Sequence, residues 1–184
     1  LLLTLLRESE RFGGVRLTGY VNRVDRGAEK QFSAVTCLLE DGTALIAFRG
    51  TDDTVVGWKE DFNMSFETAV PSQLEAVSYT QQVAKALDGP LILGGHSKGG
   101  NLAAYAGIFA QDDVRGRIRA VYNFDGPGFN EAVIASPAFE KVDMRVHTYV
   151  PQSSVIGILL WHHEPFTVVR SDRVGVFQHN VFSW

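Results

Sequence analysis

The sequence predicts an α/β fold in which a mixed, mostly parallel central sheet is flanked by helices. Strand-like and helix-like segments alternate through the second half of the chain, and β-rich segments with a hairpin turn precede them. Alternation of this kind is typical of parallel strands connected by helices, and the early hairpin adds antiparallel strands at one edge. The 184 residues show no repeat or low-complexity tract, so we interpret 1–184 as a single domain that can be part of a longer chain.

The elements follow from local patterns in chain order. Asp41-Gly42 predicts a tight hairpin turn between β-rich segments. Ser72-Gln73-Leu74-Glu75 is a capping-box pattern that predicts a helix start, and Leu91-Ile92-Leu93 is typical of a strand covered on both faces. The predicted strands are 15–24, 32–40, 44–48, 91–93, 120–124, 145–150 and 166–169, and the predicted helices are 58–66, 72–88, 101–110 and a short one near Glu131.

Composition excludes several classes of function. The net charge is −4 and the chain has no basic stripe, so we expect no nucleic-acid partner and no attraction to an anionic membrane. No apolar run approaches the roughly 18–20 residues that span a bilayer, so we expect no stable membrane insertion. The single cysteine, Cys37, cannot form an internal disulfide, which favours a reducing, cytoplasmic location.

A nucleophile motif lies between the strand at 91–93 and the following helix. Gly95-His96-Ser97-Lys98-Gly99 matches the G-x-S-x-G elbow, and its strand-before, helix-after context is the one that this motif requires. Glycines at both ends let the strand and the helix approach closely, which leaves Ser97 exposed at the helix N-terminus. The elbow predicts an α/β-hydrolase fold with Ser97 as nucleophile.

A serine nucleophile needs a base and an acid, which follow it in this order along an α/β-hydrolase chain. His179 lies in a polar loop after the last predicted strand and is the predicted base. His147 falls inside a strand, His162 and His163 look like a surface pair, and we expect His96 to point away from Ser97 across the turn.

Asp125 is the predicted acid, because it follows the strand at 120–124 on the same sheet edge as Ser97. The alternative for Asp125 is a structural role in a turn before Gly-Pro. Glu164 and Asp172, which flank the last strand, remain alternative acids.

The oxyanion hole of such a site needs two backbone donors. One is expected to be the N–H of Lys98, directly after the nucleophile. The other is expected from the strand-end loop Phe48-Arg49-Gly50-Thr51, in which Thr51 offers both its N–H and its hydroxyl. Arg49 is expected to pair with a carboxylate such as Asp61.

Four segments carry a resemblance to known families. The oxyanion-loop region with Trp58 and Asp61-Phe62, and the nucleophile segment 94–103, resemble class 3 (fungal-type) lipases. Together with 149–154 and 178–184, the pattern resembles the Mbeg1-like proteins of the α/β-hydrolase superfamily. The resemblance covers about 12–184 and implies Ser97 as nucleophile, Thr51 as oxyanion residue and His179 as base. Class 3 lipases place the acid after the strand matching 145–150, where this chain reads Pro151-Gln152-Ser153; Asp125 instead resembles the acid of pancreatic-type lipases.

These features predict a serine hydrolase that cleaves small-molecule or lipid carboxylic esters through an acyl-enzyme, without metal or cofactor. Residues 129–139 are the best candidate for a cover over the pocket, and 155–161 either line an acyl pocket or pack in the core. The loop after Thr51 is short and polar, unlike the apolar lid of an interfacial lipase, so we favour esterase or lysolipase-like activity on small or single-chain acyl substrates over bulk-phase lipolysis. The alternatives are a catalytically inactive binding module with a hydrolase-like fold, and an acyltransferase or thioesterase with the same triad. The sequence leaves the oligomeric state open.

Overall fold

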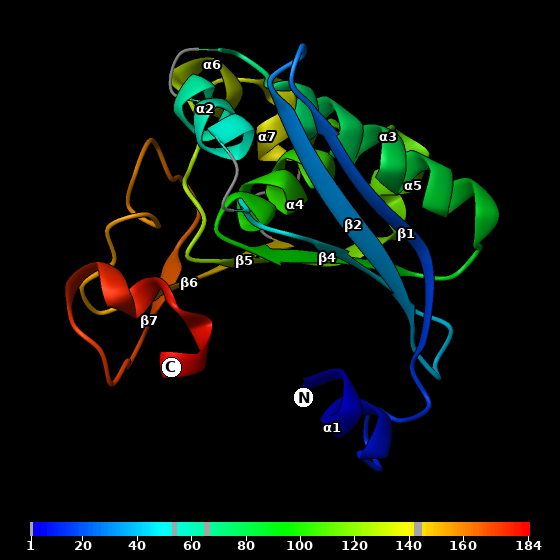
Figure 1. The fold of residues 1–184 in the computed structure, drawn as a ribbon. Helices are drawn as coiled ribbons and strands as arrows, with labels where there is room; N and C mark the ends of the chain where they lie inside the picture. The colour runs from blue at the N-terminus through cyan, green and yellow to red at the C-terminus, as the bar shows by residue number, and fades with distance from the viewer. Residues whose placement is uncertain (1, 53–54, 65–66, 142–144) are drawn as a thin grey trace.

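The structure is a computed structural model that describes residues 2–52, 55–64, 67–141 and 145–184. A seven-stranded sheet forms its centre, and helices connect most of the strands (Figure 1). The elements are, in chain order, α1 (Leu2–Glu8), β1 (Arg16–Asp25), β2 (Lys30–Leu38), β3 (Ala44–Phe48), α2 (Val55–Asn63), α3 (Pro71–Ala86), β4 (Leu91–His96), α4 (Lys98–Phe109), α5 (Asp112–Arg117), β5 (Ile118–Phe124), α6 (Glu131–Ile134), α7 (Pro137–Glu140), β6 (Val146–Pro151), β7 (Phe166–Val169), η2 (Gly175–His179) and η3 (Val181–Ser183).

The strands lie in the sheet in the order in which they occur along the chain, from β1 to β7. The pairs β1–β2 and β2–β3 are antiparallel, and every later pair is parallel. The turn between β2 and β3 contains Gly42 at φ +79°, a conformation that glycine adopts without strain. The predicted fold class, a mixed and mostly parallel α/β-hydrolase sheet, is therefore confirmed.

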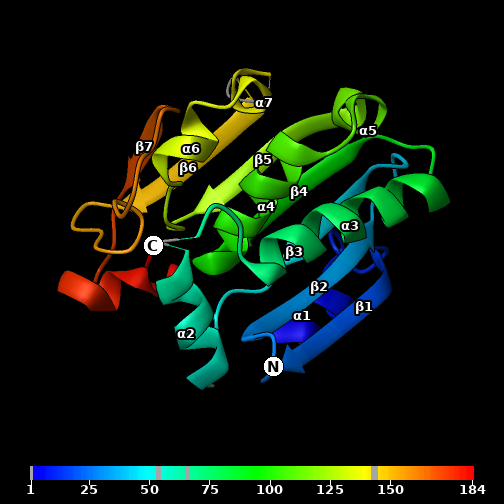
Figure 2. The same cartoon turned by 90° about the horizontal axis from the view of Figure 1, so that it is seen from above.

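The helices from α2 to α7 lie on one face of the sheet, as the two views of the ribbon agree (Figures 1 and 2). Burial alternates accordingly along β3 and along most of β6. Leu91 and Leu93 are fully buried on the helix side, whereas Ile92 between them is only partly buried. The expectation that 91–93 is covered on both faces was therefore wrong, because sequential strand order with one-handed connections places the connecting helices on the same side.

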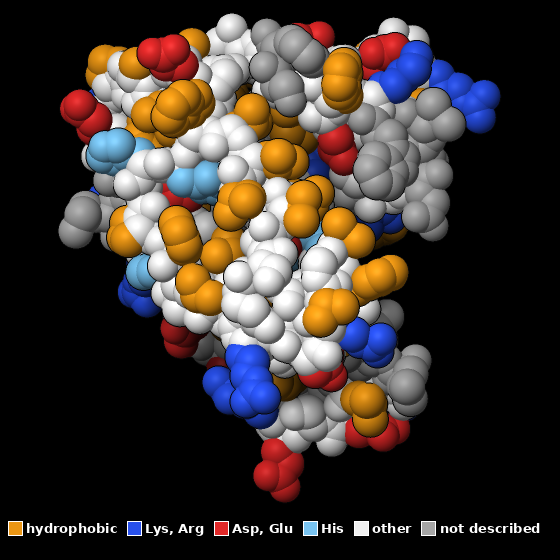
Figure 3. Space-filling view, turned by 90° about the vertical axis from the view of Figure 1, so that its left-hand side faces the viewer, with side chains coloured by type: hydrophobic (Ala, Val, Ile, Leu, Met, Phe, Trp, Pro, Cys, Tyr) orange, Lys and Arg blue, Asp and Glu red, His pale blue; other side chains and the backbone are white. Residues whose placement is uncertain are grey.

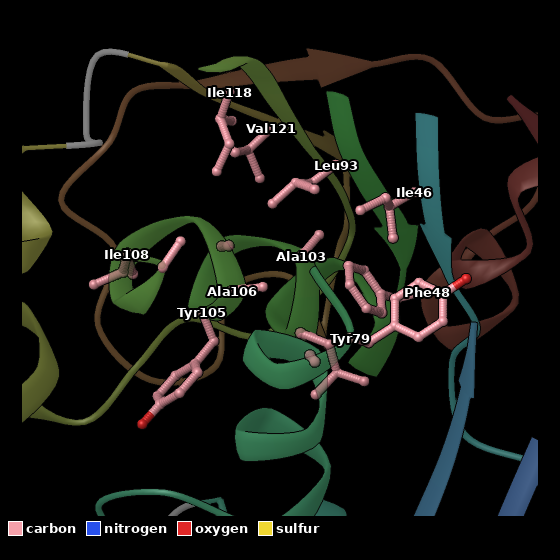
Figure 4. Packing of buried hydrophobic residues seen from close by; sticks show 14 of the residues in the cluster. Ile46, Phe48, Tyr79, Leu93, Ala103, Tyr105, Ala106, Ile108, Ile118 and Val121 are labelled. Carbon is pink, nitrogen blue, oxygen red and sulfur yellow. The ribbon is translucent and has the colours of Figure 1, made fainter. Parts of the chain in front are cut away.

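The core lies between this face and helices α3 and α4 (Figure 4). Alanines on α4, including Ala103 and Ala106, are fully buried and let the helix pack closely against Leu93 and Ile46 of the sheet. This close packing fixes α4, and with it the turn that precedes α4, relative to the ends of the parallel strands.

The N-terminus of α3 differs from its prediction. The helix begins at Pro71, a favourable first position, and Gln73 accepts a hydrogen bond from the Val70 N–H at 3.0 Å. Ser72 is inside the helix, and its N–H donates to the Glu60 side chain at 2.8 Å. The predicted Ser72 capping box was wrong because a carboxylate from another helix takes that backbone donor.

Helix α2 also differs in its bounds. It covers Val55–Asn63 instead of 58–66, and Phe66 lies outside the described residues. Among the described helices, none is both long and apolar enough to cross a bilayer.

Candidate active site

Ser97 is held in a strained turn between β4 and α4. Its backbone has φ +58° and ψ −132°, a region that costs a non-glycine residue about 1–3 kcal/mol. Two backbone hydrogen bonds stabilise this conformation: the Ser97 N–H donates to Phe124 O at 2.9 Å, and Ser97 O accepts from Gly100 N at 2.9 Å. The turn is thus fixed by the neighbouring strand and by the first turn of α4.

Glycines allow the close approach that this turn needs. A Cβ on Gly95 would lie 2.4 Å from Gly99 O, and a Cβ on Gly99 would lie 2.2 Å from Phe48 O. Real Cβ atoms do not approach backbone so closely. Gly50 in the neighbouring loop is similarly required, because its Cβ would lie 2.8 Å from His96 O; the same Cβ would lie 3.3 Å from Ser97 Cβ. The loop that carries Thr51 therefore runs directly beside Ser97.

Asp125 follows β5 and is fully buried. Its backbone has φ +52°, and its N–H donates to Tyr149 O at 2.8 Å, which ties the turn to β6. One carboxylate oxygen accepts a hydrogen bond from the Ser154 hydroxyl, and the other lies 2.7 Å from His179 Nδ1. The structure thus brings together His179 and Asp125, two predicted site residues that are 54 residues apart.

The loop of His179 is held from several sides. Gln178 is buried and accepts from Ser153 N at 2.8 Å, and the Trp184 indole donates to Gln178 O at 2.7 Å. His96 also contacts this loop. Its Nε2 lies 2.6 Å from His179 O, and the centroids of the His96 and His179 rings are 4.4 Å apart. Burial, and then the charge of His179, lower the pKa of His96. His96 points away from Ser97 toward the His179 loop, a partner that the sequence did not reveal.

The other carboxylates and histidines that the sequence singled out lie in other contacts. Glu164 accepts from Thr148 Oγ1 at 2.7 Å and from the His162 ring at 3.1 Å, and its pKa is lowered by these hydrogen bonds despite burial. Asp172 is exposed beside Arg173. His147 is on strand β6 and stacks on Tyr122 at 5.4 Å. His162 was wrongly expected at the surface: its side chain is only 12% exposed, because it packs on Glu164.

Thr51, the predicted oxyanion residue, is anchored by its side chain. Its hydroxyl donates to Asp61 Oδ2, so the hydroxyl is already occupied while the backbone N–H is a separate donor. Burial raises the pKa of Asp61, and the Thr51 hydroxyl opposes this. Arg49 pairs with a carboxylate as expected, but that carboxylate is Asp52 at 3.3 Å and not Asp61; Arg49 also donates to Asn22 at 3.2 Å.

Lys98 has a buried side chain that the sequence analysis did not anticipate. It is 1% exposed and extends away from the elbow to β2 and α2. Its Nζ lies 3.1 Å from Glu60 Oε2, 2.7 Å from Gln31 Oε1 and 3.0 Å from Gln31 O. Glu60 is fully buried as well. Because lysine is almost never buried without a partner, this ion pair is a distinctive feature of the site.

A cavity of about 430 Å³ adjoins Ser97. Thr51, Asp61, Lys98 and His179 line its polar part. The remaining walls are apolar: Phe62, Met64, Pro127, Ile156, Leu159 and Leu160. Ser97 and His179 both line this cavity, and among the described residues no direct hydrogen bond joins their side chains.

The sequence left two alternative roles for the segment 155–161, a pocket wall or core packing. In the structure, this segment contributes Ile156, Leu159 and Leu160 to the wall of the cavity. Leu160 has φ +64°, a strained conformation for a bulky side chain. The suggested cover at 129–139 is instead core: Phe129 and Phe139 are buried. No group of three metal-ligating side chains occurs among the described residues.

Apolar side chains are exposed on one face of the molecule. They gather on the face formed by the loop after β6 and the C-terminal turns (Figure 3). The exposed large hydrophobic residues of these segments are Val155, Ile158, Leu159, Trp161, Val174, Val176, Phe177 and Phe182, and Phe62 of α2 is exposed as well.

Comparison with solved structures finds lipases of the same fold. The Rhizomucor miehei lipase in complex with its propeptide matches with TM-score 0.58 and 13% identity, over 86% of this chain and 56% of that chain. M37 lipase matches with TM-score 0.61 and 16% identity, over 85% and 61%. A triacylglycerol lipase from Penicillium expansum matches with TM-score 0.52 and 11% identity, over 85% and 70%.

At these identities the likeness concerns the fold, which is that of α/β-hydrolase lipases. The chain spans 56 to 61% of the length of the first two lipases. No curated protein sequence matches it significantly. The family model described as Mbeg1-like matches residues 6–184, nearly the whole chain, and this agrees with the resemblance in the sequence. The chain therefore belongs to the Mbeg1-like family.

Proposed function

We propose that this chain is a serine esterase that cleaves carboxylic esters with Ser97 as nucleophile, His179 as base and Asp125 as acid. The observation that carries the proposal is the 2.7 Å contact between His179 Nδ1 and the buried Asp125 carboxylate, because His179 and Ser97 line the same cavity. A buried carboxylate on Nδ1 orients the ring so that Nε2 is left for the nucleophile.

The reaction would proceed by acyl transfer. Ser97 Oγ attacks the ester carbonyl carbon while its proton passes to His179 Nε2, and the carbonyl electron pair moves to oxygen. The N–H groups of Lys98 and Thr51 would stabilise that oxyanion. His179 then gives its proton to the leaving alkoxide, which departs as an alcohol. Water repeats the same steps on the acyl-enzyme and releases the acid.

The cavity supports an acyl chain as substrate. Ser97, Thr51 and His179 are part of its polar lining, whereas Phe62, Ile156 and Leu159 belong to its apolar wall. Each buried methylene contributes about 0.8 kcal/mol, so affinity should rise with chain length until the cavity is full. We therefore expect the protein to prefer esters of a single acyl chain of medium length over acetate esters.

A p-nitrophenyl ester series from acetate to palmitate tests the proposal. We expect turnover that rises and then falls with chain length and that Ser97→Ala reduces by about 10⁴-fold or more, with the fold intact. Ser78→Ala is the matched control, since Ser78 is exposed on α3. A fluorophosphonate probe should label wild type and the control but not Ser97→Ala.

The same measurements distinguish the alternatives. If folded wild type shows neither turnover nor labelling, the result would favour the alternative that the protein is a non-catalytic binding module. Labelling at Ser97 without hydrolysis, together with acyl transfer to added alcohols or thiols, would identify an acyltransferase.

A further inference from the structure

Lys98 joins the nucleophile turn to a buried carboxylate that no step of the proposed reaction uses. Its ammonium lies 3.1 Å from Glu60 Oε2, with side chains 1% and 0% exposed respectively. Burying two charges is expensive, and a buried pair of this kind is weak evidence for stability alone. The pair therefore calls for an explanation in terms of what it holds in place.

Glu60 is the centre of a buried network. Its Oε2 also accepts from Gln31 N at 2.9 Å, and its Oε1 accepts from Ser72 N at 2.8 Å. The carboxylate thus ties together β2, the start of α3 and, through Lys98, the elbow. Because all of its oxygens are engaged, Glu60 has one fixed orientation, and it passes this constraint to Lys98.

The next residue on the same helix holds the other side of the oxyanion hole. Asp61 accepts the hydroxyl of Thr51, and its Oδ1 lies 3.9 Å from Lys98 Nζ. Adjacent carboxylates of α2 therefore bind the side chains of both residues whose backbone N–H groups are the proposed oxyanion donors. One short helix sets the position of both donors relative to each other.

We propose that the buried Lys98–Glu60 ion pair is a positioning device for the oxyanion hole, which fixes the Lys98 N–H against the tetrahedral intermediate formed at Ser97. This inference rests on the proposed esterase function. Lys98 and Glu60 are positioning residues, because their side chains act through the Lys98 backbone donor and not on the substrate.

The test compares Lys98→Met, Glu60→Gln and the double variant with wild type and with Lys30→Met. Lys30 is the matched control, since it starts the same strand β2 and pairs with Glu75, which does not line the Ser97 cavity. We measure kcat and KM on a medium-chain p-nitrophenyl ester, the melting temperature, and the Ki of an alkyl trifluoromethyl ketone. Ser97 Oγ adds to the carbonyl carbon of this ketone. The resulting oxyanion then occupies the same position as the oxyanion of the tetrahedral intermediate in ester cleavage.

We expect Lys98→Met to lower kcat by about 10- to 100-fold with little change in KM, because a donor displaced by a fraction of an ångström is felt only in the transition state. The Ki for the ketone should rise by the same factor. The double variant leaves no lone buried charge, so it should regain melting temperature without regaining kcat. Lys30→Met should lower the melting temperature only.

Three results would overturn the inference. The first is a Lys98→Met enzyme with wild-type kcat and Ki. The second is a double variant in which kcat returns together with the melting temperature, which would make the pair purely structural. The third is wild type without Ser97-dependent turnover, which would overturn the proposed function as well; the first two leave that function intact. If Lys98→Met does not fold, Glu60→Gln and the double variant decide.

Discussion

Asp125→Asn is the sharpest test of the proposed acid, because the substitution keeps the shape of the side chain and removes its charge. Asp125 is fully buried and serves two donors, His179 Nδ1 at 2.7 Å and the Ser154 hydroxyl. The asparagine oxygen can still accept from His179, while its amide can donate to Ser154 Oγ, which accepts equally well. The orientation of the ring should therefore survive.

The loss is then mainly the attraction between the carboxylate and the imidazolium that forms in the transition state. Two charges about 4 Å apart interact by about 4 kcal/mol at an effective dielectric constant of about 20. At about 1.4 kcal/mol per tenfold, kcat should fall by about 10³-fold. The assay is ester turnover at neutral pH, with circular dichroism and melting temperature as controls for folding.

Glu164→Gln and Asp172→Asn are the comparison variants. Glu164 is engaged by Thr148 and His162, and Asp172 is exposed, so neither should change kcat strongly. Loss of activity in Glu164→Gln or Asp172→Asn at unchanged stability, with a mild effect in Asp125→Asn, would refute the assignment of the acid.

Three further predictions follow from the packing around the site. Ile156→Trp should fill part of the cavity and shift the preferred p-nitrophenyl ester to a shorter acyl chain, whereas an unchanged chain-length profile would remove this cavity as the acyl pocket. Gly95→Ala should prevent folding, since its Cβ would meet backbone at 2.3 Å, whereas Gly116→Ala, whose Cβ meets nothing within 4 Å, should raise the melting temperature; soluble, folded Gly95→Ala would contradict this. His96→Gln should flatten the fall in melting temperature below about pH 6.5. The lowered pKa of His96 makes the unfolded chain bind the proton first, so wild type loses stability as pH falls, and an equal slope in both proteins would count against it.

Local patterns predicted most of the fold. The Asp41-Gly42 turn and the last strand at 166–169 were recovered, because a hairpin turn and a short β-branched run are decided by neighbouring residues. The start of α3 was not predicted correctly, because the carboxylate that binds the Ser72 N–H comes from Glu60 on another helix. The one-sided cover of β4 was also missed, since an apolar run does not show which of its faces the helices occupy.

The same distinction applies to the site. The order of Ser97, Asp125 and His179 along the chain follows from general rules of the fold, and the structure joins the last two directly. The partners of long charged side chains could not be predicted from the order of residues along the chain. Arg49 and Lys98 can each reach many carboxylates, and their actual partners, Asp52 and Glu60, depend on how α2 packs. Only the three-dimensional arrangement decides such choices.

The pentapeptide 95–99, which carries the proposed nucleophile, also connects distant parts of the chain. Its two variable residues bind opposite parts of the molecule: His96 contacts the C-terminal loop of His179, and Lys98 reaches β2 and α2 near the start of the chain. Ser97 lies between them in a strained backbone conformation, which persists only where the surroundings determine it fully. The His96 ring contacts the backbone of the predicted base, and we propose that the Lys98 side chain positions the Lys98 N–H, so a change at either residue should disturb a different step of the proposed reaction. His96 variants should affect proton transfer, and Lys98 variants should affect stabilisation of the oxyanion.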